Sequence, residues 1–397
     1  MSDPYLPPEI LDSIIDLLHD EPETLRQCCL VSKSWVPRAR RHLFAYVKFR
    51  SSRDLWLWTE TFPDVANSPA YHTHTLNVGC PLFVITSTSD PKVGSWIQAF
   101  SGIACLDVVN GIQNLNYWNS LAPFHKIAPA LKSLRVGLLP LPHPELFDLI
   151  CSLPLLEDLT LRGYSGRLRK IADPHGRRTV IPSTSPLLTG SLNLATHGGV
   201  GSVARQLLDL PNGLHFRKVT FSWDRKEDHQ WITELVANCS PTLEYLDVRS
   251  RRRKSVRFSV RADSLTSFQV TSGSGSFNLS KAMKLRDVVF RPESNSVEWI
   301  IMALQTITSK HKDPRRISVY VPHRLTIFSA GADIMQHLGE ASEEWLSLDR
   351  LLLQLLESRS VRLMVGCAKL GEEGQNTEYC FACLLPEITR RGIVDAV

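Results

Sequence analysis

The stretch Leu156-Glu157-Asp158-Leu159-Thr160-Leu161 decides how this chain of 397 residues is interpreted. It places an apolar residue, two variable residues, an apolar residue, one variable residue and a final apolar residue in order. The alternation of its second half is typical of a half-buried strand. Close copies recur along the chain at Ile103–Val108, Leu131–Val136, Phe216–Phe221, Leu243–Val248, Leu265–Val270 and Leu285–Phe290.

The spacing of these copies predicts the architecture. Weaker copies lie at Val47–Phe49, Leu76–Val78, Leu192–Leu194 and Ile317–Val319, and successive copies are centred 20 to 33 residues apart. Leucine-rich repeats run at about 20–29 residues. Helical segments are predicted between the copies at Leu55–Phe62, Ser95–Phe100, Glu145–Leu153, Val203–Leu210, His229–Asn238 and Val297–Thr308. We therefore expect an α/β fold over residues 51–397, a parallel sheet lined by helices in an irregular leucine-rich-repeat solenoid.

Some segments depart from this period. Gly163–Pro186 is polar and rich in Gly, Pro and Ser, which predicts a surface loop, and Pro322–Leu338 is a long connection without a predicted structure. Glu343–Glu357 carries leucines at helical spacing. Val361–Val365 is a candidate for the last strand, and Phe381–Leu385 for a segment that pairs with it or caps the sheet.

Residues 6–49 show a helical pattern instead. After Pro7 and Pro8, apolar residues recur at helical spacing at Ile10, Leu11, Ile14, Ile15, Leu17 and Leu18. A second helix is predicted from near Pro22, and a third, capped by Ser32 or Ser34, contains Trp35, Ala39 and Leu43. About forty residues are too few to bury three helices this apolar. Part of their surface must therefore meet either the rest of the chain or a partner.

The order Leu-Pro-x-Glu-Ile-Leu, then Leu-x-x-Cys-x-Leu-Val-Ser and a tryptophan, resembles the F-box. Its positions here are Leu6, Pro7, Glu9, Ile10, Leu11, Leu25, Cys28, Leu30, Val31, Ser32 and Trp35. The resemblance implies that residues 1–50 form an all-α module that docks on a Skp-type adaptor and, through it, on a cullin–RING ubiquitin ligase. The adaptor-binding residues it implies are Leu6, Pro7, Ile10, Leu11, Ile14, Leu25, Cys28, Leu30, Val31 and Trp35. The alternative is a helical cap that serves only this chain.

The totals indicate a globular protein, because 43% of the residues are hydrophobic and 21% are charged. The start Met1-Ser2-Asp3-Pro4 lacks the features of a signal peptide, and no stretch approaches the ~20 apolar residues of a membrane span. Nine cysteines in mostly apolar surroundings suit a reducing compartment. We therefore expect an intracellular protein of the cytoplasm, the nucleus or both, without a membrane partner.

Searches for enzyme chemistry find only fragments of motifs. Gly273-Ser274-Gly275 lacks the rest of a dinucleotide fingerprint, and His197-Gly198-Gly199 has no accompanying nucleophile elbow. Cys380 and Cys383 form a Cys-x-x-Cys without a second pair, and His72 and His74 lack a third ligand. We expect no catalytic residue, no cofactor and no metal site.

A basic run at Arg249–Arg261 holds seven cationic residues, and removing these from the net charge of +5 leaves the rest of the chain at −2. The surplus charge is therefore local, and no nucleic-acid-binding motif accompanies it. The run is interpreted as a solvated loop, an anion-binding surface or a nuclear-import signal. On the second interpretation, Arg251, Arg252, Arg253 and Lys254 grip an acidic or phosphorylated segment of a target.

These features predict a non-enzymatic substrate-recognition subunit of an SCF-type ubiquitin ligase with an unknown protein target. The stretches Cys239–Asp247 and Leu348–Ser358 also resemble the repeat region of fungal F-box proteins. The alternative function is a repeat scaffold that binds the adaptor without delivering a client for ubiquitylation.

Overall fold

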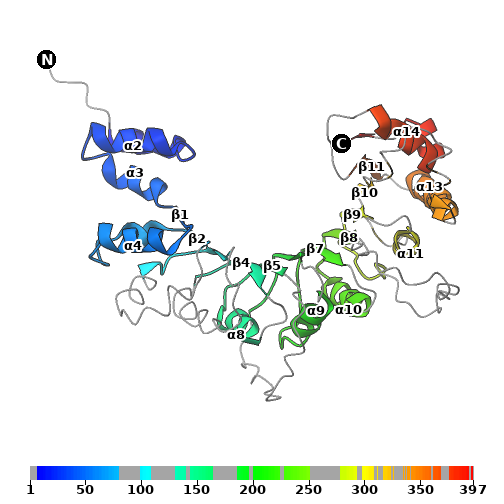
Figure 1. Ribbon diagram of the computed structural model, residues 1–397, viewed down its shortest axis with the longest axis horizontal. Helices are drawn as coiled ribbons and strands as arrows, with labels where there is room; N and C mark the ends of the chain where they lie inside the picture. Colours follow the sequence, from blue (N-terminus) through cyan, green and yellow to red (C-terminus); the bar gives the residue numbers. More distant parts are fainter. Residues whose placement is uncertain are drawn as a thin grey trace, which may run out of the picture. The chain divides into compact units, whose positions relative to one another are not determined.

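The computed structural model describes residues 7–79, 99–108, 130–139, 144–163, 186–195, 200–223, 228–250, 278–292, 297–307, 311, 316–322, 325, 334, 336, 338–339, 341–358, 361–367, 375–392 and 395–396. Its contacts divide the chain into two compact units. The first unit holds the described residues up to Arg162, and the second holds those from Leu188 onward. Each unit is described by itself (Figure 1).

The first unit begins with three short helices, α1 (Pro8–Leu17), α2 (Pro22–Val31) and α3 (Val36–Leu43). Each has a proline in its first two positions, where a missing N–H costs little. No side-chain cap starts α3, whose N-cap residue is Trp35, so the predicted cap by Ser32 or Ser34 is wrong. Ser32 Oγ instead accepts a hydrogen bond from the backbone N–H of Ser34, which shapes the turn before the helix.

These helices share one small core. Ile15, Leu25, Cys28 and Ala39 are buried together, and Leu18, Cys29, Trp35 and Leu43 pack against them while partly exposed. The core therefore takes one or two residues from each helix, as the helical periodicity predicted.

The rest of the first unit is a parallel sheet in chain order: β1 (Tyr46–Phe49), β2 (Thr75–Val78), β3 (Cys105–Val108), β4 (Ser133–Leu139) and β5 (Asp158–Gly163). Buried aliphatic residues align across it, with Leu76 opposite both Val47 and Leu106, and Leu106 opposite Leu134. The connections contain α4 (Ser52–Thr61), a 3-10 turn (Pro69–His72) and α8 (Pro144–Ser152). Ser51 and Asp54 form a capping box that starts α4.

The second unit repeats this arrangement with β6 (Ser191–Ala195), β7 (Lys218–Trp223), β8 (Tyr245–Ser250), β9 (Asp287–Arg291), β10 (Arg316–Val321), β11 (Arg362–Cys367) and β12 (Asp395–Ala396). Neighbouring strands again pair in parallel and in chain order. Its helices are α9 (Val200–Leu208), α10 (His229–Cys239), α11 (Glu298–Gln305), α13 (Ala341–Ser358), α14 (Gln375–Leu384) and α15 (Pro386–Arg390).

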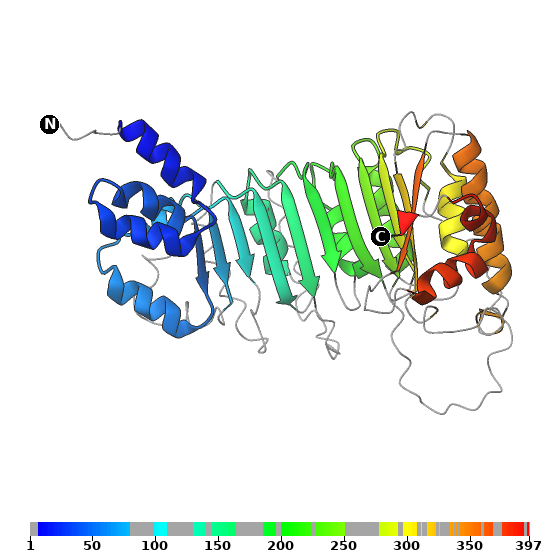
Figure 2. The same ribbon diagram turned by 90° about the horizontal axis from the view of Figure 1, so that it is seen from above.

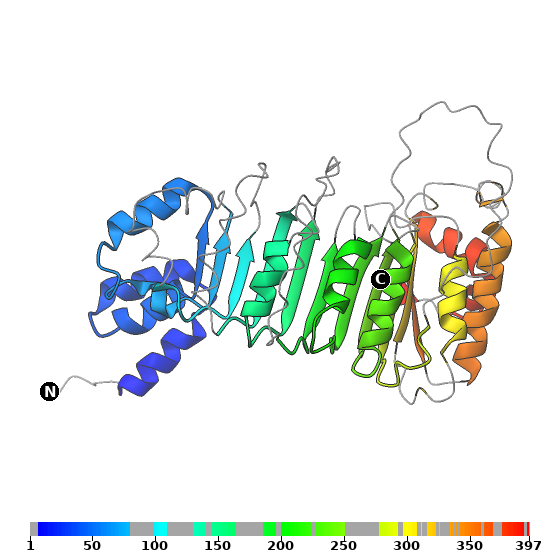
Figure 3. The ribbon, with the colours of Figure 1, turned by 90° about the horizontal axis from the view of Figure 1, so that it is seen from below.

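The two faces of this second sheet differ. Figures 1 and 3 show α9 and α10 lying on one face. Alternate strand residues are buried, including Val219, Phe221, Leu246, Val248 and Phe290, as expected for the face that helices cover. Figure 2 shows the opposite face, over which no helix of the described residues lies. The alternate, mostly polar residues of the strands point to this helix-free face.

The sequence predictions of secondary structure are confirmed at most of the described copies. Leu265–Val270, Gly163–Pro186 apart from its ends, and most of Pro322–Leu338 lie outside the described residues. Leu246 of β8 pairs directly with Val288 of β9, so these two copies are neighbours in the sheet. One prediction at the C-terminal end is corrected, since β12 follows β11 in the sheet. Residues 381–384 lie in α14, which rules out the first alternative for this segment, that it pairs with β11 as a strand.

The predicted boundary at residue 50 falls just after β1. Val47 and Phe49 are buried, and β1 pairs with β2 along its length, so residues 46–49 belong to the sheet. The three-helix module therefore ends near Phe44, the C-cap residue of α3.

Candidate functional site: the outer face of the helical module

Helix α1 carries two apolar stripes. Ile15, only 2% exposed, and Leu18 pack in the module core, and Leu11, four residues before Ile15, lies on the same side of the helix. At 100° per residue, Ile10, Ile14 and Leu17 form a second stripe about 100° around the helix from the first. This second stripe is uncovered, because Ile10, Ile14 and Leu17 are 48%, 45% and 81% exposed.

Helix α2 ends in a second exposed apolar pair. Leu30 is 79% exposed and Val31 is 67% exposed, although both follow Cys28, which is buried in the core. An exposed large aliphatic residue is ordinary by itself, but five within one module of three short helices are not. We call Ile10, Ile14, Leu17, Leu30 and Val31 the outer face of the module.

The adaptor-binding residues that the resemblance implied divide into exposed, half-buried and core residues. Ile10, Ile14, Leu30 and Val31 lie on the outer face, Pro7 is an exposed N-cap residue of α1, and Leu6 lies outside the described residues. Leu11 and Trp35 are half-buried, while Leu25 and Cys28 are core residues. These core residues hold the helices together beneath the outer face rather than offering surface themselves.

Sequence reasoning missed one member of the outer face. Leu17 was recognised as part of the helical pattern of α1 but not as a site residue. Its spacing from Ile10 and Ile14, seven and three residues, was the available signal, because residues at i, i+4 and i+7 share one side of a helix.

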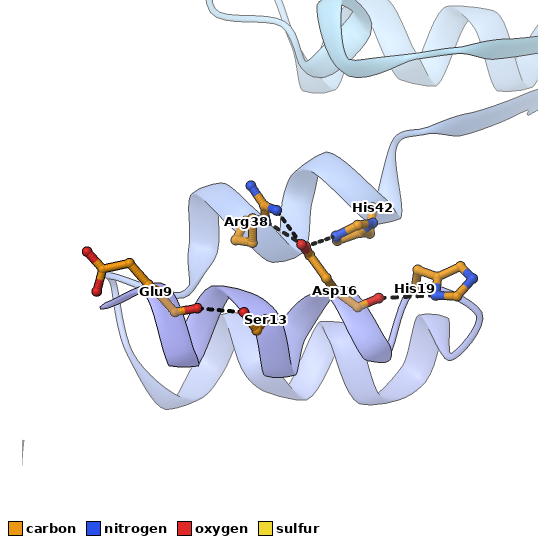
Figure 4. Close-up of polar contacts among 6 residues, drawn as sticks. All are labelled: Glu9, Ser13, Asp16, His19, Arg38 and His42. Atoms are coloured by element: carbon orange, nitrogen blue, oxygen red, sulfur yellow. Dashed lines mark hydrogen bonds and ion pairs between the residues drawn. The ribbon is translucent and has the colours of Figure 1, made fainter. Parts of the chain in front are cut away.

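A polar network fixes α1 against α3 (Figure 4). Arg38 Nε donates to Asp16 Oδ1 at 2.6 Å, the Arg38 terminal NH₂ group pairs with Oδ2, and His42 Nε2 lies 2.7 Å from Oδ1. The hydrogen bonds from these partners hold the pKa of the Asp16 carboxyl well below its usual range, and the one from Arg38 has the largest effect. Asp16 lies between Ile15 and Leu17, so the network sets the orientation in which α1 presents its outer stripe.

The same helix has two local hydrogen bonds that Figure 4 also draws. Ser13 Oγ donates to the carbonyl of Glu9 at 2.8 Å, and His19 Nδ1 lies 3.1 Å from the carbonyl of Asp16. Both are hydrogen bonds between a side chain and its own helix, so they add to helix formation without covering the apolar stripe.

The other residues singled out from the sequence do not gather into a site. Arg251–Lys254, Gly273–Gly275 and His197–Gly199 lie outside the described residues. Cys380 is buried in α14, three residues from Cys383, and the pKa of His72 is lowered by burial and by the nearby arginines Arg41 and Arg40. Among the described residues, no group of three or more His, Cys, Asp or Glu side chains is placed to hold a metal ion.

Within the described part of the chain, every helix is too short or too polar to cross a bilayer.

Comparisons with known proteins do not identify the site. No protein-family model matches this chain, and no curated protein matches it either. The outer face is therefore interpreted from its exposure, its chemistry and the resemblance of its sequence.

Proposed function

We propose that this chain is a substrate-recognition subunit of an SCF-type cullin–RING ubiquitin ligase. In this proposal the helical module is an F-box that docks on a Skp-type adaptor through its outer face. The α/β region, an irregular leucine-rich-repeat-like structure, binds the target protein. The observation that carries the proposal is the uncovered outer face on a module that already has a complete core of its own.

The chemistry of the outer face supports docking on a protein. Its residues are aliphatic, so burying them against a partner stabilises the complex by roughly 1.5–3 kcal/mol for each fully buried side chain. Leu17 and Leu30 have the most to gain, because about four-fifths of each lies in solvent. A helical cap that served only this chain would instead direct these side chains toward the neighbouring strands.

Such a subunit does no bond chemistry. It holds the target beside the charged conjugating enzyme of the ligase, and the rate increase comes from proximity and orientation. The described residues offer this role an exposed apolar face and a parallel sheet.

The test is capture of a purified Skp-type adaptor by the full-length chain and by charge-insertion variants. Ile14→Glu and Leu30→Glu each place a carboxylate in the outer face and should abolish capture, because the charge would have to be desolvated on docking. Gln305→Glu is the matched control, because it adds the same charge at an exposed position of α11, outside the helical module. Failure of the unmodified chain to capture the adaptor, or equal loss in all three variants, would sink the proposal.

A second measurement separates a ligase subunit from a scaffold. Some proteins that carry ubiquitin in cells expressing the unmodified chain should carry less in cells that express the Leu30→Glu variant instead. If the adaptor is captured and no protein shows this dependence, the chain is a scaffold that binds the adaptor without delivering a client.

A further inference from the structure

Charged side chains from four neighbouring strands gather on the helix-free face of the second unit. In the register of β7 to β10, Tyr245 is opposite both Lys218 and Asp287, Asp287 is opposite Arg316, and Arg249 is opposite Arg291. All of these residues alternate with the buried residues that face the helices. We call the charged members the arginine cluster: Lys218, Asp247, Arg249, Asp287, Arg291 and Arg316.

Two aspartates orient the arginines of this cluster. Asp247, whose side chain is only 3% exposed, accepts a hydrogen bond from Arg249 Nη2 at 3.0 Å and one from Arg291 Nε at 3.3 Å. Asp287 accepts a hydrogen bond from Arg316 Nε at 3.1 Å. Each guanidinium is therefore held from one side by a carboxylate beside it.

Two tyrosines hold the cations from other sides. The guanidinium carbon of Arg291 lies 3.8 Å from the centre of the Tyr320 ring, and Lys218 Nζ lies 4.7 Å from the centre of the Tyr245 ring. The pKa of Tyr245 is raised, first by burial and then by the charge of Asp247, which agrees with its place inside the cluster. Side chains that are already ordered lose less freedom when a ligand binds.

The aspartates do not balance the charge. Four cations face two carboxylates within the cluster. Arg291 and Arg316 donate to the aspartates through Nε alone. Among the described residues, the two terminal NH₂ groups of Arg291 and of Arg316 therefore have no hydrogen-bond partner. The side chains of Arg291 and Arg316 are 28% and 41% exposed, so an incoming ligand can reach them.

We propose that the arginine cluster binds an acidic segment of the target protein, with Arg291 and Arg316 each donating two parallel hydrogen bonds to an anionic group. The planar guanidinium matches the geometry of a carboxylate or a phosphate in this way. This inference rests on the proposed function, because the bound segment belongs to the protein that the ligase subunit recruits. The predicted anion site at Arg251–Lys254 lies outside the described residues, and the arginine cluster is a separate candidate site that shares Arg249, the first residue of the basic run.

The size of the cluster favours a protein segment over a nucleic acid. Strands lie about 4.8 Å apart and rise about 3.3 Å per residue, so Arg249 and Arg291 are level on neighbouring strands, and Arg316, which is level with Asp287, lies roughly 13 Å along the sheet from them. This footprint suits two or three acidic side chains. A nucleic-acid backbone has a phosphate at every step, and the carboxylates of Asp247 and Asp287 would repel some of them.

The test is binding of fluorescein-labelled probes to the purified full-length chain, measured by fluorescence anisotropy. The probe is a peptide of alternating glutamate and serine, and the reference peptide has glutamine in place of glutamate. We expect the glutamate peptide to bind and to weaken as salt is raised, and the glutamine peptide to bind much less. Tighter binding of a phosphoserine version would also support the inference and would identify phosphate as the preferred anion.

Variants of the chain locate the site. Arg316→Gln should weaken the glutamate peptide roughly tenfold, as expected for loss of a bidentate charged contact. Arg316→Lys keeps the positive charge but loses the planar guanidinium. Its affinity for the glutamate peptide should lie between those of the unmodified chain and Arg316→Gln, and unchanged thermal unfolding would show that the variant is still folded. Arg286→Gln is the matched control. Arg286 is an exposed arginine directly before Asp287, and because side chains alternate between the two faces of a strand, it is not on the same face as the arginine cluster.

The possible outcomes are distinct. Equal weakening by Arg286→Gln and Arg316→Gln, equal binding of both peptides, or tighter binding of an oligothymidylate strand would overturn the inference. Adaptor capture by the same preparations tests the proposed function separately. If the adaptor is not captured but peptide binding still depends on Arg316, the proposed function fails and the acidic-segment site stands.

Discussion

Two leucines on helix α2 allow the core of the helical module to be separated from its outer face by one type of substitution. Leu25 is 1% exposed and packs with Ile15, Cys28 and Ala39, whereas Leu30 is 79% exposed. Replacing either leucine by alanine removes the same atoms from the same helix. Alanine and leucine are both strong helix formers, so helix propensity contributes little to the comparison.

The expected free-energy changes differ severalfold. Removing three buried side-chain carbons costs about 2.4 kcal/mol at roughly 0.8 kcal/mol each. The cavity left behind in a small core raises the cost of Leu25→Ala to about 3 kcal/mol or more. Leu30→Ala removes atoms that lie mostly in solvent already, so we expect a cost of about 0.5 kcal/mol. With tenfold for each 1.4 kcal/mol, these costs correspond to roughly a hundredfold and about a twofold change in the opening equilibrium.

Amide hydrogen exchange of the full-length chain measures this directly, because it reports the opening of α2 separately from the rest of the protein. Leu25→Ala should speed exchange throughout α2 by at least about a hundredfold, or remove its protection altogether, while exchange in β7 to β11 stays unchanged. Leu30→Ala should leave exchange almost unaltered and still weaken adaptor capture. Comparable acceleration of exchange in both variants would refute the division into core and outer face.

Three further predictions concern other polar and titratable groups. Because Arg38 and His42 hold the pKa of Asp16 low in the folded state, Asp16 adds stability above its unfolded pKa near ~4, and this stability is lost as the pH falls further. Asp16→Asn should therefore be less stable than the unmodified chain at neutral pH, and the difference in thermal unfolding should shrink under acid. Burial raises the pKa of Cys239 to about 12, so Cys239 should resist alkylation by N-ethylmaleimide in the native chain near about pH 8, as read by peptide mapping. Asp349, which is 1% exposed, accepts backbone hydrogen bonds from Glu387 and Ile388 at the start of α15, so Asp349→Ala should cost about 1–2 kcal/mol in denaturant unfolding and Asp349→Asn less.

The strands were predictable because their signal is local. In β5 and β8 every second residue is a buried aliphatic one, as at Leu159, Leu161, Leu246 and Val248, and this alternation needs no knowledge of neighbours. Whether such a segment joins the sheet depends on which strand edges its backbone meets. The pairing of Leu246 in β8 with Val288 in β9 is an example, because neither copy of the pattern specifies its neighbour.

The ends of elements were less predictable, for a different reason. Ser32 and Ser34 both have the chemistry of an N-cap, but their hydroxyl groups bond to each other and to the turn, and α3 begins after Trp35. Phe381 was expected in or near the sheet because it is apolar, and it is buried, but it lies in a helix. An apolar residue predicts burial more securely than it predicts the element in which the residue is buried.

The candidate sites depend on information that the apolar pattern does not contain. On α1 the six apolar positions recur at one helical spacing, and only packing separates Ile15, which the core covers, from Ile14, which it does not. On the second sheet the repeat pattern marks the buried positions and leaves the positions between them unassigned. Asp247, Arg291 and Arg316 occupy such positions and come from copies far apart in sequence, so strand register brings them together. In a repeat of this kind the apolar positions determine the fold, and the positions between them can carry the charged groups for which we propose a role in target binding.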